Sequence, residues 1–133
     1  MGEIADGVVL NAYVPPAYVR YAVAEIRSAA TAAGRDPNAI DMACMLVIRL
    51  TDDPDSMRPT LKQRIVRLLD EHRVGEILLD KGGFDIGILK PLRETVKREG
   101  EKAATHLISD EMVDAFYLVG PADYCKARLE EYR

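Results

Sequence analysis

The sequence predicts a helix-rich α/β fold with about two parallel strands and five or six helices. Two short apolar runs, Ile4–Asn11 and Ile40–Thr51, have the composition of buried strands. One amphipathic helix separates them, and a strand–helix–strand order implies parallel pairing through a right-handed crossover. Helical periodicity fills most of the remaining chain, so we expect helices to outnumber strands.

Turn residues bound the first strand and the helix that follows it. The turn pair Asp6-Gly7 leads into the first apolar run, and we interpret Asp6 as a turn residue. Pro15 and Pro16 suit the first turn of a helix, where a missing N–H group costs little. An alanine-rich stripe at helical spacing predicts a helix that ends near Gly34, a plausible C-cap.

The second strand is expected to be buried on both faces. The segment Met42–Ile48 is almost continuously apolar, which is typical of a strand inside a parallel sheet. A buried helix is the alternative interpretation of such a run. The β-branched residues Val47 and Ile48, and the turn residues that follow them, favour the strand.

The second half of the chain predicts a series of helices separated by turns. The expected elements are a helix from about Met57 to Arg73, a short element at Gly75–Leu79, a turn at Asp80–Asp85, a helix around Leu89–Val96 closed by Gly100, one or two turns within Lys102–Ile108, a helix capped by Ser109, and a last helix after Gly120-Pro121. No strand is expected after the last helix.

Composition places the chain among ordinary globular proteins. Its 133 residues suit one domain, and 48% hydrophobic with 30% charged residues is unremarkable. A net charge of −4 without a basic run disfavours nucleic acid as a partner. The apolar runs are too short for a membrane span, and no secretion signal is visible, so we expect a cytoplasmic protein. Cys44 and Cys125 are expected to be free, buried thiols in a reducing cytosol.

Three stretches of the chain together resemble a known family. They are GEIADGVVLN at the start, GRDPNAIDMACMLVIRLTDD at Gly34–Asp53, and FYLVGPADYCKARLEEYR at Phe116–Arg133. In this order and spacing they resemble the C-terminal part of the bacterial-luciferase-like oxidoreductases that use flavin or coenzyme F-420. The branch most similar to the chain is that of methylenetetrahydromethanopterin reductase.

The resemblance implies a partial TIM barrel over residues 1–133 as a single domain. In that alignment Ile4–Asn11 is similar to the sixth barrel strand and Met42–Thr51 to the seventh. Phe116–Arg133 is similar to the approach to the eighth strand. The family's first five strands and its last strand are then absent from this chain, whereas complete barrels have about 250 residues or more.

The resemblance also implies an activity. Members of the family are oxidoreductases or monooxygenases that transfer a hydride with coenzyme F-420 or FMN and a small-molecule substrate. For this short chain we expect impaired or absent activity and assembly into a homo-oligomer. The alternative is a non-catalytic, oligomerising half-barrel, or a helical interaction module of unknown function. A helix at Met42–Ile48 would favour the helical module.

The candidate cofactor-binding residues are Asn11, Tyr13, Arg49 and Thr51. They lie at the C-terminal ends of the two expected strands, where TIM barrels bind their ligands. Asn11 could equally be a turn residue that bonds its own backbone. Arg49 could bind a phosphate or carboxylate, pair with an acid, or lie at an exposed edge.

No residue is identified as catalytic or metal-binding. His72 and His106 have no ligand-like spacing, so we expect both to be solvated residues near helix ends. The abundant carboxylates, for example Glu130 and Glu131, are expected on solvated helix faces, and no pair is marked for acid–base chemistry.

Overall fold

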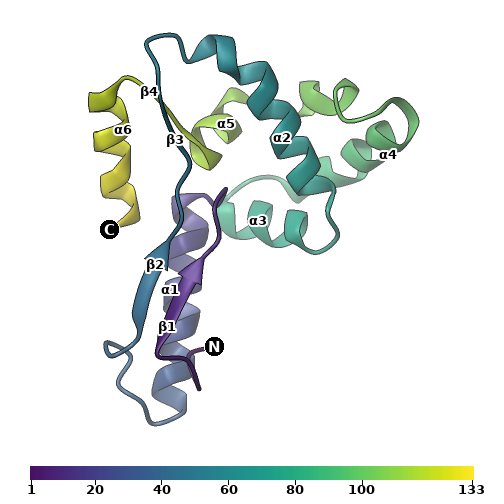
Figure 1. The fold of residues 1–133 in the computed structure, drawn as a ribbon. Helices are drawn as coiled ribbons and strands as arrows, with labels where there is room; N and C mark the ends of the chain where they lie inside the picture. The colour runs from purple at the N-terminus through teal and green to yellow at the C-terminus, as the bar shows by residue number, and fades with distance from the viewer.

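The computed structural model describes all 133 residues and contains four short strands and six α-helices (Figure 1). The strands are β1 (Gly7–Leu10), β2 (Asp41–Cys44), β3 (Ile48–Leu50) and β4 (Leu118–Gly120). The α-helices are α1 (Pro16–Ala32), α2 (Arg58–Asp70), α3 (Val74–Gly82), α4 (Leu89–Glu99), α5 (Asp110–Phe116) and α6 (Ala122–Leu129). Short 3₁₀ turns lie at Asp55–Met57, Ile86–Ile88, Ala103–Leu107 and Glu130–Tyr132.

The strands form two parallel pairs along one extended segment. β1 pairs with β2 so that Val8 lies opposite Met42, and β3 pairs with β4 so that Arg49 lies opposite Val119. The prediction of one continuous strand over Ile40–Thr51 is therefore wrong, since the segment forms two strands and the first of them ends at Cys44. The division occurs because the chain changes its hydrogen-bonding partner there, from β1 to β4.

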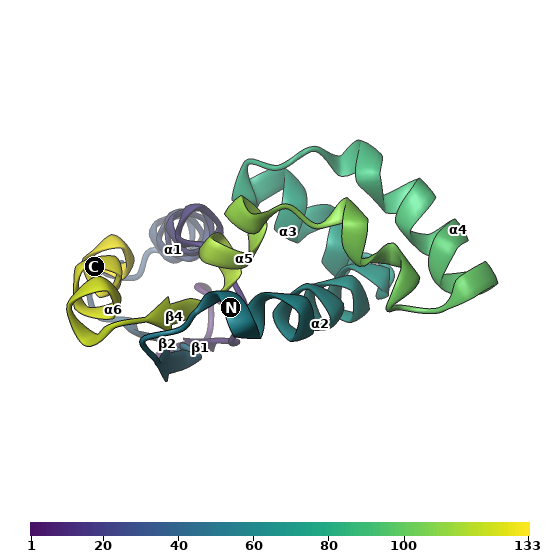
Figure 2. The same cartoon turned by 90° about the horizontal axis from the view of Figure 1, so that it is seen from above.

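The expectation that the second strand is buried on both faces is also wrong. α1 covers one face of the β1–β2 pair (Figures 1 and 2). The other face is open: the exposed fractions are 65% for Val9, 50% for Met45 and 67% for Leu50. A strand of this apolar composition is typical of a sheet that has helices on both faces, but within this chain helices cover only one face.

β4 is a strand that the sequence pattern does not predict. It has three residues, all of them buried, and therefore lacks the two-residue alternation that marks a half-exposed strand. Its hydrogen bonds come from a distant segment: the N–H of Leu118 donates to the carbonyl of Val47, and that of Thr51 donates to the carbonyl of Gly120.

The N-terminal turn is held by Arg35, which follows α1. Its guanidinium donates to the carbonyls of Gly2 and Ala5 and to the Asp6 carboxylate, the last at 2.8 Å. This confirms Asp6 as a turn residue. It also explains why β1 begins at Gly7 and not at Ile4, since residues 2–4 form a turn.

Most helix predictions are confirmed, with shifted ends. The Ser109 hydroxyl accepts a hydrogen bond from the N–H of Met112 and caps α5. Gly100 ends α4 with φ of 88°. The expected helix to Arg73 ends at Asp70, because Arg73 adopts φ of 72° and starts a separate helix, α3. The Met42–Ile48 segment contains no helix, which removes the support for the purely helical interpretation.

The main core lies among the helices and not on the sheet. α2 is central to it, and Figure 2 shows α3, α4 and α5 around this helix. Its inward residues are almost fully buried: Leu61, Ile65, Val66 and Leu69. They lie at helical spacing on one face, as burial against several partners requires. No helix has both the length and the hydropathy of a membrane span.

Candidate functional site

The chain turns sharply where β1 ends. Asn11 and Ala12 follow the strand, and Tyr13 then adopts φ of 66°, a left-handed conformation that is rare for a residue with a side chain. Holding such a conformation costs about 1 to 3 kcal/mol and occurs where the surrounding structure imposes it. The strained residue therefore lies at the C-terminal end of a parallel strand, the location where α/β folds bind ligands.

Tyr13 faces a second aromatic residue from the far end of the chain. The rings of Tyr13 and Tyr117 have centroids 5.4 Å apart and are tilted by 59°. Together with one side of α2 they line a half-open cavity of about 440 Å³, which is within the range of small-molecule sites. Its lining residues are Tyr13, Arg64, Arg67, Leu68, Glu71 and Tyr117. We call this the tyrosine cavity.

The two arginines of the tyrosine cavity differ in their partners. Arg67 donates two hydrogen bonds of 2.8 Å to the carboxylate of Glu101, and this carboxylate neutralises the charge of Arg67. Arg64 forms no ion pair and no hydrogen bond. Burial raises the pKa of Tyr117 to about 12; neighbouring Tyr13 also raises it, and the charge of Arg64 opposes this effect. Arg64 is solvent-exposed, and it lines the tyrosine cavity together with Tyr117.

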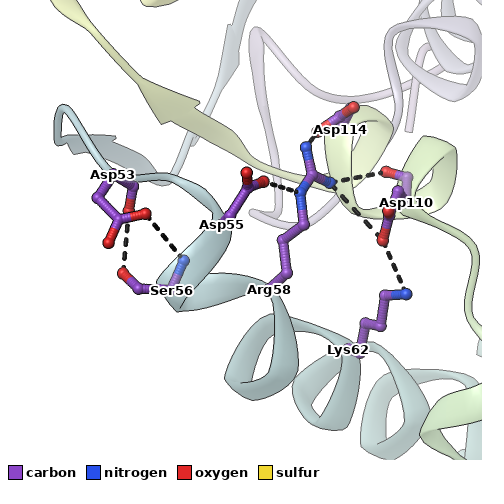
Figure 3. Close-up of polar contacts among 7 residues, drawn as sticks. All are labelled: Asp53, Asp55, Ser56, Arg58, Lys62, Asp110 and Asp114. Carbon is purple, nitrogen blue, oxygen red and sulfur yellow. Dashed lines mark hydrogen bonds and ion pairs between the residues drawn. The ribbon is translucent and has the colours of Figure 1, made fainter.

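A network of ion pairs holds α5, and therefore Tyr117, against α2 (Figure 3). Arg58 lies 2.9 Å from Asp55 and 3.1 Å from Asp114, and it donates to the carbonyl of Asp110. Lys62 pairs with the Asp110 carboxylate at 2.7 Å and lowers its pKa, with a smaller effect from Arg58. Because Tyr117 directly follows α5, this network fixes one wall of the tyrosine cavity.

Asn11 borders a smaller neighbouring cavity and not the tyrosine cavity. This second cavity has about 310 Å³, and Leu68 lies between the two. The Asn11 side chain accepts a hydrogen bond of 2.8 Å from the N–H of Ala12. The local turn role that the sequence leaves open for Asn11 is therefore present in the structure, and only its amide nitrogen is free.

Arg49 and Thr51 lie farther along the sheet. The N–H of Met45 bonds the carbonyl of Leu10, so Asn11 is level with Met45, and the four residues from there to Arg49 span up to about 14 Å. Arg49 is exposed and has no ionic partner. The Thr51 hydroxyl accepts from the N–H of Asp53. The structure therefore brings Asn11 near Tyr13, but it does not bring Arg49 and Thr51 to the same place.

The histidines and cysteines form no site. His72 and His106 are both exposed, as expected, and His106 contacts only the carbonyl of Ala103 three residues earlier. Cys44 and Cys125 are free thiols; Cys125 is buried as expected, but the expectation is wrong for Cys44, which is only half-buried because one face of its strand pair is open. No group of three metal-ligating side chains occurs in the chain.

The residues of the α2 wall and Tyr117 were not among the candidate site residues predicted from the sequence. The wall residues Arg64, Arg67 and Leu68 lie at helical spacing on one face of α2, and Glu71 directly follows the last residue of that helix. That spacing could have identified them as one surface. Nothing local in the sequence places Tyr117 beside Tyr13, because their contact joins residues at opposite ends of the chain.

Comparison with known proteins places this geometry in a family. The family model described as luciferase-like monooxygenase matches residues 1–133. The chain is similar to the 5,10-methylenetetrahydromethanopterin reductases of Methanolobus tindarius, at 30% identity over 132 residues, and of Methanopyrus kandleri, at 29% over 130 residues. Each alignment covers 98% of this chain and 39% or 36% of the relative.

A solved structure agrees with the sequence matches. The coenzyme F-420-dependent tetrahydromethanopterin reductase of Methanopyrus kandleri superposes with a TM-score of 0.75 at 27% sequence identity. The superposition covers 98% of this chain and 37% of that one, so the chain spans little more than a third of its relatives' length. The fold is thus a helix-rich part of the TIM barrel of such reductases. The chain belongs to the luciferase-like monooxygenase family.

Proposed function

We propose that this chain contributes one wall of a deazaflavin site in a luciferase-like oxidoreductase. The observation that carries the proposal is the tyrosine cavity, which opens beside the C-terminal end of β1 and is bounded by two aromatic rings. The relatives include a reductase named for its dependence on coenzyme F-420. A deazaflavin supplies hydride transfer when bound, while the protein binds it, orients it and excludes water.

The residues at this end of the sheet suit a planar polar ring. Tyr13 offers a ring face, and the buried Tyr117 has a hydroxyl without a hydrogen-bond partner. The free amide nitrogen of Asn11 is a further donor nearby. Arg49, up to about 14 Å along the sheet, and Thr51, up to about 21 Å along it, are proposed to contact an extended part of the cofactor. FMN is the second cofactor that this assignment admits.

The experiment is a fluorescence titration of the purified chain with coenzyme F-420, with FMN in parallel. Saturable binding in the micromolar range, about −8 kcal/mol, is expected. Tyr13→Ala and Asn11→Ala should weaken it, and Arg20→Gln, an exposed arginine on α1, should not. Absence of saturation with both cofactors, or equal affinity of all variants, would contradict the proposal. Hydride transfer to a small-molecule substrate by this chain alone is expected to be impaired or absent.

A second candidate function is a non-catalytic half-barrel that self-associates. The observation that favours it is the open apolar face of the sheet, where Val9, Met45, Ile48 and Leu50 are between 42% and 67% exposed. Open apolar strands promote association between chains. Sedimentation of the chain at several concentrations tests it. If the chain is a monomer at all concentrations and also binds coenzyme F-420, this second candidate function is excluded. For both candidate functions the cytoplasm is the proposed compartment.

A further inference from the structure

The turn that contains Tyr13 has few hydrogen bonds of its own. The N–H and the carbonyl of Tyr13 make no hydrogen bond within the chain. Pro15 and Pro16, which follow, have no N–H to donate. The local bond between Ala12 and the Asn11 side chain lies before Tyr13. Because a left-handed residue persists only where the surrounding structure imposes it, a contact from another part of the chain is expected here.

One hydrogen bond reaches this turn from the opposite end of the chain. The hydroxyl of Tyr132, in the 3₁₀ turn Glu130–Tyr132, donates to the carbonyl of Val14 over 3.1 Å. The two residues are 118 positions apart in the sequence. The other hydrogen bonds of residues 12–15 stay within the turn and the start of α1. The Tyr132 hydroxyl is therefore the one group outside this region that is hydrogen-bonded to the turn.

Both partners of this hydrogen bond are shielded from water. Val14 is 7% exposed, and the half-buried ring of Tyr132 packs against the main core. Tyr132 also lines a surface hollow together with Val19 and Val23 of α1, the helix that begins after the turn. Burial raises the pKa of Tyr132 to about 12, so the phenol keeps its proton and remains a donor at neutral pH. A hydrogen bond in such surroundings is stronger than the same bond in water.

The hydrogen bond lies one residue away from a wall of the tyrosine cavity. Val14 directly follows Tyr13, whose ring centroid is 5.4 Å from that of Tyr117. Fixing the Val14 carbonyl limits the backbone conformations that are open to Tyr13. Without this restraint a residue with a side chain favours the extended or right-handed regions, and either of them would move the ring away from Tyr117.

We infer that Tyr132 is a positioning residue of the tyrosine cavity: its hydroxyl holds Tyr13 in the left-handed conformation through the Val14 carbonyl. Tyr132 does not line the cavity and so acts only through the turn. Its effect on cofactor binding rests on the proposed function, whereas its effect on the position of the Tyr13 ring does not. The C-terminal 3₁₀ turn thus takes part in a site that is built after β1.

Tyr132→Phe tests the inference, and Tyr124→Phe is the matched control. Phenylalanine keeps the ring and its packing, and it removes only the hydroxyl. The Tyr124 hydroxyl accepts a hydrogen bond of the same length, 3.1 Å, from Arg128 within α6. Each variant therefore loses one tyrosine hydroxyl and one hydrogen bond, but only Tyr132→Phe releases the turn after β1.

NMR spectroscopy of the whole chain measures the position of the Tyr13 ring. In the wild type the rings of Tyr13 and Tyr117 are close enough for a nuclear Overhauser effect between their protons. In Tyr132→Phe this cross-peak should weaken, and the carbonyl carbon signal of Val14 should move upfield. Both signals should be unchanged in Tyr124→Phe. A hydrogen bond with a purely structural role would change the carbonyl signal and leave the contact between the rings as it is.

A fluorescence titration with coenzyme F-420 measures the effect on the proposed cofactor site. Tyr132→Phe should weaken binding about two- to tenfold, which is the effect of one net hydrogen bond on an equilibrium. Tyr124→Phe should bind the cofactor as tightly as the wild type. Circular dichroism shows that both variants are folded, as expected for substitutions that keep the aromatic ring.

Several results would overturn the inference. It falls if the contact between the Tyr13 and Tyr117 rings is the same in Tyr132→Phe and Tyr124→Phe, or if the two variants bind coenzyme F-420 equally well. It also falls if Tyr132→Phe is unfolded, since the hydroxyl would then support the whole fold and not one turn. If the wild type binds neither coenzyme F-420 nor FMN, the proposed function is refuted, and the NMR comparison still decides the positioning role of Tyr132.

Discussion

Leu69→Ala is expected to destabilise the helix that forms the wall of the tyrosine cavity. Leu69 is 0% exposed and belongs to the main core, so its truncation removes buried apolar surface and leaves a cavity. Such substitutions cost about 3 to 5 kcal/mol at fully buried leucines. This is a large part of the total stability of a domain, which is about 5 to 15 kcal/mol.

Leu68→Ala is the matched control, because it changes the same residue type on the same helix. Leu68 is only partly buried and lies between the two cavities. We expect a loss of about 1 kcal/mol there, since less apolar surface is lost and no closed void is created. Helix propensity changes equally in both variants and slightly favours alanine. The difference between them therefore measures burial alone.

Urea unfolding followed by circular dichroism provides the measurement. With an unchanged slope, the midpoint should fall by about 1 to 3 M for Leu69→Ala and by well under 1 M for Leu68→Ala. In a thermal scan the corresponding decreases are about 10 to 20 °C and about 3 to 5 °C. Equal losses in the two variants would refute the placement of Leu69 in the core and of Leu68 at the cavities.

Three further predictions concern charge, capping and backbone strain. The hydrogen bond from Arg93 lowers the pKa of Glu76 from 4.5 to about 2. The contribution of this pair to the free energy of unfolding is therefore complete above about pH 4.5 and is lost as the pH falls toward 2. Glu76→Gln should lack this part of the pH dependence when the protein is unfolded by acid. Ser109→Ala should lower the free energy of unfolding, measured by urea unfolding, by about 1 kcal/mol, because it removes the N-cap of α5. Ser28→Ala, at an exposed position within α1, is the control and should not lower it. Arg73→Gly should raise the thermal midpoint, because glycine relieves a left-handed strain of about 1 kcal/mol, and Arg73→Ala, which keeps the strain, should not.

Local signals in the sequence predicted those features whose causes are local. Ser109 and Gly100 were correctly identified as helix ends because capping depends on residues within one turn. The apolar run correctly predicted a strand that ends shortly before Tyr13. The rule that TIM barrels bind ligands at the C-terminal ends of their strands then made Tyr13 a candidate, and its cofactor role remains a proposal. The left-handed conformation of Tyr13 was not predicted, because residues with a side chain rarely adopt it and no glycine marks the position.

Features that depend on distant pairing were not predicted. β4 has too few residues for a periodic pattern, and it becomes a strand only because β3 lies beside it. The division of the second apolar run follows from the same pairing, since β2 and β3 have different partners. Nothing in the sequence distinguishes Arg64 and Glu71 from other charged residues of the helical region, because they line a cavity only through the placement of Tyr117.

The sequence by itself determined the helix-rich α/β class, the parallel strand order and the family. These follow from apolar periodicity, turn residues and an ordered set of short stretches, all of which are properties of neighbouring residues. Only the tertiary structure decided that residues 13 and 117 form one cavity, that Arg67 is neutralised, and that Arg64 is not. Such contacts bring together residues far apart along the chain, and their formation depends on the packing of several helices at once.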